Sequence, residues 1–118
     1  MVGRNPDAPE HVWTFLSNYA HVLVCIARQP DVTVREMADA VGITERATHR
    51  IVNELVDAGV VTRWKDGRRN RYRVELSTPL RHPLESEKTV GDLLKALLPR
   101  TDAAALARRH RPERSASG

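Results

Sequence analysis

The sequence feature that most constrains the fold is a pair of short helical segments on either side of a glycine turn, in TVREMADAVGITERATHRIVNELVDAG. Thr33 precedes Glu36 by three residues, the spacing of a capping box in which each side chain bonds the other residue's amide. Thr44 caps the start of the second helix. Gly42 and Gly59 end the two helices because glycine takes the left-handed conformation at little cost. Two short helices so closely joined predict a helix-turn-helix.

A further amphipathic helix precedes this pair, with predicted bounds at Ser17 and Arg28 and Pro30 just beyond its end. Its apolar residues recur at spacings of three and four and define a predicted buried face: Phe15, Tyr19, Val22, Leu23, Ile26 and Ala27. The same spacing in the second helix of the pair predicts a buried face that consists of Thr48, Ile51, Val52 and Leu55.

From Val60 onward the hydrophobic period changes to two, which predicts a β-hairpin. A tight Asp66-Gly67 turn would place Arg63 on the apolar face. A longer loop from Asp66 to Asn70 sets Trp64 across from Tyr72 and keeps both faces consistent. We therefore predict the longer loop, with Val60, Thr62 and Trp64 sharing the face of Tyr72, Val74 and Leu76.

The charge of the chain is concentrated in two places. The net charge is +4, but residues 60–73 alone carry +5 and the segment from Pro99 onward carries +3, so the remainder is mildly acidic. Like charges this close repel one another unless something negative lies opposite. Cationic segments of this kind indicate a polyanionic partner.

The C-terminal part contains a connector broken by prolines, STPLRHPLESEK, and then a helix with five large apolar residues on one side. A small domain has limited space for this helix, and two-fold dimers are the commonest assembly. We therefore predict a dimer interface, with Trp13 and Phe15 as neighbours of the helix: Trp13, Phe15, Val90, Leu93, Leu94, Leu97 and Leu98.

The predicted organisation has four parts. Residues 1–12 form a flexible N-terminal segment, residues 13–78 a DNA-binding domain, and residues 79–99 the connector and dimerisation helix. Residues 100–118 form a basic tail that we expect to be disordered. A weak alanine-rich helix over residues 101–109 stays open as an alternative.

The segments VREMADAVGITERATHRIVNELVDAGVVTR and GRRNRYRV, with the preceding helix, resemble the winged helix-turn-helix domain of bacterial transcriptional regulators of the MarR and ArsR type. The resemblance covers roughly Ser17 to Leu76. It implies a mainly α fold with a small β-hairpin (α+β) and an appended C-terminal helix. Helix 33–41 is then the positioning helix and helix 45–58 the recognition helix. These families usually bury an aliphatic residue at the position of Thr48, so this threonine is a departure.

The recognition helix keeps a strip of small, polar and basic residues away from its buried face. The resemblance implies that Arg46, Ala47, His49 and Arg50 face the major groove. Helical spacing extends this strip to Asn53, whose side chain suits adenine but lies late in the helix. We predict base contacts from these five residues. Contacts to the DNA backbone or minor groove are predicted from the helix cap and the wing: Thr44, Arg63, Lys65, Arg68, Arg69, Arg71 and Arg73. A solvated helix face and a charged strand edge are the alternative interpretations.

Several function classes find no support in the sequence. No run of about eighteen apolar residues predicts a membrane span, and the N-terminus lacks the pattern of an export signal. The single cysteine, Cys25, excludes an internal disulfide and fits a cytoplasmic protein, and it departs from the paired cysteines of metal-sensing ArsR relatives. His21 and Cys25 have a zinc-compatible spacing but no partner ligands. We expect no catalytic residues, no metal and no cofactor.

These patterns predict a sequence-specific transcriptional regulator that binds double-stranded DNA as a homodimer. Two alternatives stay open: a winged-helix module for protein contacts, and a non-specific nucleic-acid or RNA binder. The partners expected are double-stranded DNA and a second copy of the chain, and a small-molecule effector of unidentified chemistry stays open.

Overall fold

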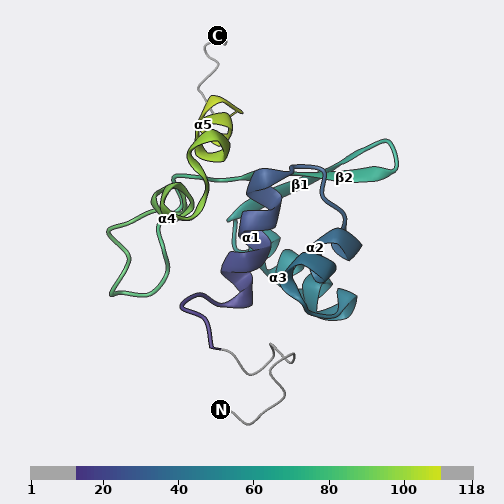
Figure 1. The fold of residues 1–118 in the computed structure, drawn as a ribbon, viewed down its shortest axis with the longest axis horizontal. Coiled ribbons are helices and arrows are strands. Elements are labelled where there is room, and N and C mark those ends of the chain that lie inside the picture. The colour runs from purple at the N-terminus through teal and green to yellow at the C-terminus, as the bar shows by residue number, and fades with distance from the viewer. Residues whose placement is uncertain (1–12, 110–118) are drawn as a thin grey trace.

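The structure, a computed structural model, describes residues 13–109. Along the chain these residues form α1 (Asn18–Arg28), α2 (Val34–Val41), α3 (Glu45–Asp57), β1 (Val61–Asp66), β2 (Arg69–Val74), α4 (Val90–Leu97) and α5 (Arg100–Arg109). Helices joined to one antiparallel hairpin confirm the predicted α+β winged-helix class (Figure 1). The flexible segment predicted for residues 1–12 lies outside the described residues.

Helix α1 is the centre of the core and packs against α2 and α3 on one side and α4 and α5 on the other (Figure 1). Its buried residues are Val22, Leu23, Ile26 and Ala27, as the apolar period predicted. The prediction was wrong for Phe15, which is 92% exposed, and for Tyr19, which is 41% exposed. Tyr19 instead turns its hydroxyl outward to donate a hydrogen bond to the Glu54 carboxylate of α3.

Both helix caps of the helix-turn-helix form as predicted. The Glu36 amide donates to the Thr33 hydroxyl at 3.0 Å, and the Thr33 amide donates to the Glu36 carboxylate at 2.9 Å. At the start of α3 the Ala47 amide donates to the Thr44 hydroxyl at 3.0 Å. Gly42 ends α2 at a φ of 86°, in the left-handed region that favours glycine. Local sequence chemistry therefore fixes the start of both helices and the turn between them.

The register of the hairpin differs from the prediction. Arg63 lies across from Tyr72 and Trp64 from Arg71, so the longer loop is wrong. The turn consists of Gly67 and Arg68 between Asp66 and Arg69, and Gly67 has a φ of 67°. This agrees with a type II′ turn, which takes glycine at its first central position and suits the strand twist.

The adjacent valines Val60 and Val61 explain the wrong register. Both are buried, so the alternation of apolar residues does not show which of them begins the buried face of β1. Val61 pairs with the buried Val74, and Arg63 follows it on the same face. Trp64 is consequently on the opposite face and 46% exposed. Arginine is tolerated on the packed face because its stem reaches past the apolar residues to a polar partner.

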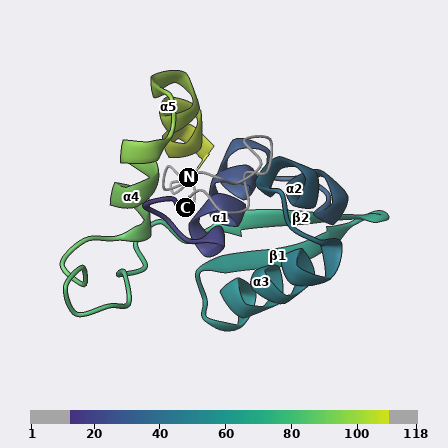
Figure 2. The same cartoon turned by 60° about the horizontal axis from the view of Figure 1, so that its bottom comes forward.

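The strands of the hairpin run side by side, with β1 nearer to α3 and β2 nearer to α1 (Figure 2). A backbone hydrogen bond of 2.9 Å from the Tyr72 amide to the Pro30 carbonyl ties β2 to the loop between α1 and α2. The hairpin tip extends beyond the helices on the side away from α4 (Figure 1). The base of the wing is thus anchored to the rest of the fold.

Helices α4 and α5 complete the core beside α1. Thr89 and Asp92 form a second capping box at the start of α4, and Val90, Leu94 and Leu98 are buried. The tail was predicted to be disordered from residue 100, but residues 100–109 form α5, which buries Leu106 against the core. The alanine-rich helix left open for residues 101–109 is therefore the correct interpretation. Among the helices of residues 13–109, none has both the length and the apolar character that a bilayer-spanning segment needs.

Candidate nucleic-acid interface

Helix α3 has one face sealed in the core and one face open to solvent. Thr48, Ile51, Val52 and Leu55 are buried, as predicted. Arg46, His49 and Arg50 are exposed on the opposite face, and Ala47 between them is half-buried. The helix therefore presents basic and imidazole groups outward from a rigidly packed support.

Polar contacts as well as apolar packing hold α3 in place. The Thr44 cap satisfies an amide at the N-terminus, the end of a helix that carries partial positive charge. Farther along, the carboxylate of Glu54 accepts the hydrogen bond from Tyr19 of α1, which raises the pKa of that tyrosine above its ordinary value. These contacts fix the direction in which Arg46 and Arg50 project.

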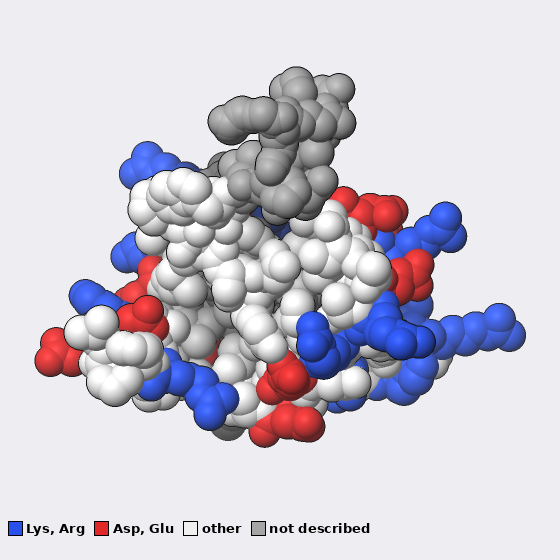
Figure 3. Space-filling view, turned by 90° about the horizontal axis from the view of Figure 1, so that it is seen from below, with Lys and Arg blue, Asp and Glu red and all other residues white. Residues whose placement is uncertain are grey.

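The exposed cations of α3 and the hairpin differ in whether they have an acidic partner. Within residues 13–109, Arg46 and Arg50 of α3 and Lys65 and Arg68 of the hairpin form no ion pair. These four side chains carry uncompensated positive charge. Figure 3, seen from below, shows Lys and Arg gathered at the right of the molecule, the side on which the hairpin extends.

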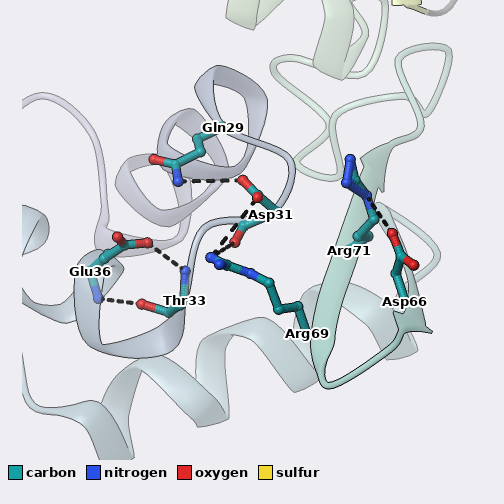
Figure 4. Close-up of polar contacts among 7 residues, drawn as sticks. All are labelled: Gln29, Asp31, Thr33, Glu36, Asp66, Arg69 and Arg71. Atoms are coloured by element: carbon teal, nitrogen blue, oxygen red, sulfur yellow. Dashed lines mark hydrogen bonds and ion pairs between the residues drawn. The ribbon is translucent and has the colours of Figure 1, made fainter.

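Three other wing arginines, Arg69, Arg71 and Arg73, have acidic partners. Arg69 lies 3.9 Å from the Asp31 carboxylate, Arg71 3.6 Å from Asp66, and Arg73 4.0 Å from Glu75. Figure 4 shows Arg69 reaching from the hairpin to Asp31 on the loop after α1, and Arg71 turned toward Asp66. Exposed pairs of this kind contribute about 0–1 kcal/mol, so they leave the arginines partly neutralised and able to exchange partners.

Arg63 and Asn53 were predicted as separate DNA contacts, but the structure brings them together. The Arg63 guanidinium donates to Asn53 Oδ1 at 2.8 Å. The bond joins β1 to α3 because Arg63 faces inward in the observed register. Sequence reasoning missed this link, and it also missed the contact between Arg69 and Asp31, because the two partners of each contact are far apart in the sequence.

A sequence model of the MarR family matches residues 15–71, from just before α1 into β2. These residues are therefore similar to a MarR-family domain. The match supports a DNA-binding role in transcription regulation, and it gives no support to the ArsR part of the resemblance. Comparisons with curated proteins and with solved structures returned no match. Helices α4 and α5 lie outside the matched residues.

The residues predicted for the dimer interface divide into a buried set and an accessible set. Val90, Leu94 and Leu98 are buried in the chain's own core and are therefore not accessible to a partner. Trp13 and Phe15 are 74% and 92% exposed and pack edge to face with their ring centroids 4.9 Å apart. Leu97 is exposed and Leu93 half-buried. An interface formed by these residues stays a prediction.

A groove of about 480 Å³ lies next to the exposed aromatics. The start of α1, the connector after β2 and the first turns of α4 form its walls: Phe15, Leu16, Leu23, Pro79, Val90 and Leu93 line it. Leu84 of the connector is 90% exposed, a hydrophobic residue that the sequence analysis did not single out.

Residues 13–109 contain no group of three or more His, Cys, Asp or Glu side chains placed to hold a metal ion. Cys25 is half-buried on α1, and this burial raises the pKa of its thiol above the ordinary value. A raised pKa disfavours the thiolate that both metal binding and nucleophilic attack require.

Proposed function

We propose that the protein is a transcriptional regulator that binds specific sequences of double-stranded DNA with α3 in the major groove and the hairpin beside it. One observation carries the proposal: the exposed face of α3 and the hairpin both hold cations without acidic partners. Like charges held this way repel one another, and a polyanion relieves the repulsion. A helix of this size fits the major groove of B-DNA.

The residues of α3 divide by the chemistry of their side chains. Arg46 and Arg50 lie one turn apart, and each suits the two acceptors of guanine, worth about 1–3 kcal/mol of discrimination for each pair. His49 between them supplies a further hydrogen-bonding group, and Ala47 suits the methyl group of thymine. Thr44 lies at the N-terminus of the helix, where amides and the helix dipole favour a phosphate.

The hairpin supplies the sequence-independent part of the affinity. Lys65 and Arg68 carry unpaired charge and suit phosphates or the narrow minor groove. Arg69, Arg71 and Arg73 contribute less, because each would first have to leave an acidic partner. The number of effective cations on the wing is therefore smaller than the sequence alone predicts.

We further propose that the regulator acts as a homodimer through the accessible apolar residues before α1 and on α4, chiefly Trp13, Phe15, Leu93 and Leu97. A two-fold dimer places two copies of α3 in successive major grooves, so the operator is an imperfect inverted repeat with half-sites about 10 base pairs apart, or a multiple. Replacement of both exposed aromatics, Trp13→Ser with Phe15→Ser, is expected to convert the dimer to a monomer in sedimentation.

A small-molecule effector has a candidate site beside the wing, with Arg71 and Arg73 among the residues that line it. A cavity of about 250 Å³ lies where β2 meets α1 and α5, and Ile26, Pro30, Trp64, Tyr72 and Arg109 are among its lining residues. Apolar walls with a few polar groups suit a small organic molecule. A compound that raises the melting temperature of the native protein, but not that of the Trp64→Ala variant, would identify this cavity as its site.

Selection of bound duplexes from a random pool tests the proposed function. The expected result is an enriched inverted repeat, and Arg50→Ala is expected to relax the preference at one position of each half-site. Lys95→Ala is the matched control, because it removes an exposed cation from α4, on the far side of α1 from the hairpin (Figure 1).

Three outcomes would contradict the proposal. Equal affinity for random duplexes, single strands and RNA would indicate a non-specific nucleic-acid binder. Salt-resistant binding of a protein without any duplex affinity would indicate a module for protein contacts. Unchanged duplex selection by the Arg50→Ala variant would show that α3 does not determine the sequence preference.

A further inference from the structure

The two strands of the wing are fastened to different elements, β1 to α3 and β2 to the loop between α1 and α2. On β1, the Arg63 guanidinium donates to Asn53 Oδ1 of α3 at 2.8 Å. On β2, the Arg69 guanidinium donates to the Asp31 carbonyl oxygen at 3.1 Å, with the Asp31 carboxylate 3.9 Å away. Asp31 is itself oriented by Gln29, whose amide donates to its carboxylate at 3.4 Å (Figure 4).

Neither contact is needed to hold the base of the hairpin. The buried pair Val61 and Val74 and the Tyr72–Pro30 backbone bond already anchor that end. Arg63 acts at the level of Tyr72, its cross-strand partner, and Arg69 acts in the last pair before the turn. Both lie beyond the Val61–Val74 pair, in a part of the hairpin where a two-stranded ribbon alone is marginally stable and strongly twisted. The two contacts therefore restrict the angle of the outer part of the wing.

The position of Asn53 also disfavours a role in reading bases. A bidentate contact to adenine requires both the oxygen and the nitrogen of the carboxamide to face the base edge. In the structure the oxygen faces Arg63. Asn53 lies about 12 Å along α3 from its first residue, at a rise of about 1.5 Å per residue, whereas the N-terminal residues of a recognition helix contact the bases.

We propose that Asn53 and Asp31 are positioning residues that clamp the wing, so that Lys65 and Arg68 meet the DNA at a fixed distance from Arg46 and Arg50. This inference rests on the proposed function, since it concerns how two parts of one DNA-binding surface are set relative to each other. The clamp acts before DNA arrives. It makes the protein selective for the spacing between a major-groove sequence and the adjacent minor groove.

The first test needs no DNA. Amide hydrogen exchange in the outer hairpin of the free protein, residues 63–70, is expected to accelerate about threefold to tenfold in Asn53→Ala, the range for loss of one hydrogen bond. A smaller acceleration is expected in Asp31→Ala, which removes the carboxylate 3.9 Å from Arg69 but keeps the backbone carbonyl that accepts its hydrogen bond. Asn53→Asp keeps an acceptor for Arg63 and is expected to restore protection. Asp39→Ala, which removes an exposed acid from α2, is the matched control. Unchanged exchange in both clamp variants overturns the inference, whatever the protein binds.

The second test separates positioning from base reading. In duplex selection, Asn53→Ala is expected to keep the bases preferred by α3 and to lose preference only at the flanking positions next to the wing. The double variant Asn53→Ala with Arg63→Ala should then show the same duplex preference as Arg63→Ala alone, because the two substitutions remove the same hydrogen bond. Relaxed preference at a single base pair in Asn53→Ala, with none in Arg63→Ala, would assign Asn53 to base reading and overturn the inference. Absence of duplex binding by the native protein would instead count against the proposed function.

Discussion

Thr48 is joined twice to Thr44 at the start of α3. The Thr44 carbonyl oxygen accepts the Thr48 amide at 3.0 Å and the Thr48 hydroxyl at 2.8 Å. Thr48 is completely buried, so its hydroxyl is satisfied by the helix itself. This explains how a polar residue occupies a position where the MarR resemblance implies an aliphatic one, because an unpaired buried hydroxyl would cost about 1–3 kcal/mol.

Thr48→Val should therefore leave α3 intact. The variant loses one hydroxyl bond but buries an additional methyl group, and the Thr44 carbonyl keeps its backbone partner. These terms are similar in size, so the free energy of unfolding should match or exceed the native value by less than about 1 kcal/mol. Thr48→Ala also leaves a cavity, so it should lower the free energy of unfolding by about 1–2 kcal/mol. Urea denaturation followed by circular dichroism measures both, and a large loss in the valine variant would refute this account.

The salt dependence of DNA binding should distinguish the unpaired wing cations from the paired ones. Lys65→Ala combined with Arg68→Ala removes two cations without acidic partners. Each lost phosphate contact changes the slope of log affinity against log salt by about 0.9, so the slope should flatten by about 2 for each subunit. Fluorescence anisotropy over a series of salt concentrations measures the slope.

Arg71→Ala combined with Arg73→Ala is the control for that experiment. It removes the same charge from cations that face Asp66 and Glu75. A clearly smaller flattening is expected. Equal flattening in the two double variants would mean that the ion pairs of the wing open when DNA binds.

The helix-turn-helix could be predicted from the sequence because its determinants are local. Thr33 and Glu36, and Thr44 and Ala47, are three residues apart and bond within one helical turn. The single buried face of α3 likewise follows from helical spacing alone. Helix α3 and its exposed strip were accordingly placed by sequence reasoning.

The wing could be predicted only in part, because its geometry depends on pairing across the chain. Two adjacent buried valines conceal the register of β1, and a register shift of one residue exchanges the two faces of a strand. Asn53 bonds Arg63 ten residues away and Arg69 bonds Asp31 across 38 residues, and neither separation leaves a sequence pattern. Polar residues on such surfaces look alike in sequence whether they face DNA or each other.

The C-terminal helix shows a second limit of sequence reasoning. An apolar stripe indicates that a helix face is buried, but it does not indicate by what. Val90 and Leu94 of α4 pack on the chain's own core, whereas Leu97 of the same helix is exposed. The stripe thus contains both core residues and residues that remain accessible to a second copy.

Stability in acid should depend on Asp92. Its carboxylate accepts the Thr89 amide at 2.9 Å, and this backbone hydrogen bond lowers the pKa of Asp92 below its ordinary value. A lowered pKa in the folded state contributes stability above the unfolded pKa of about 3.9, and that contribution disappears as the pH falls through the folded pKa. The difference in unfolding free energy between the native protein and Asp92→Ala should be constant above about pH 5 and shrink below about pH 4. A difference independent of pH would show that the carboxylate charge plays no part in the cap.

Gly91 should resist replacement although it lies inside a helix. Alanine is favoured over glycine there by about 1 kcal/mol of helix propensity. A Cβ atom at Gly91, however, would lie 2.9 Å from the Leu76 carbonyl oxygen, which also accepts the Gly91 amide at 2.8 Å. Relief of this clash requires α4 to move away from the chain that follows β2, and overpacking of this kind costs about 1–3 kcal/mol. The clash exceeds the propensity gain, so Gly91→Ala should lower the free energy of unfolding by about 1 kcal/mol in urea denaturation, and an increase would show that α4 is free to shift.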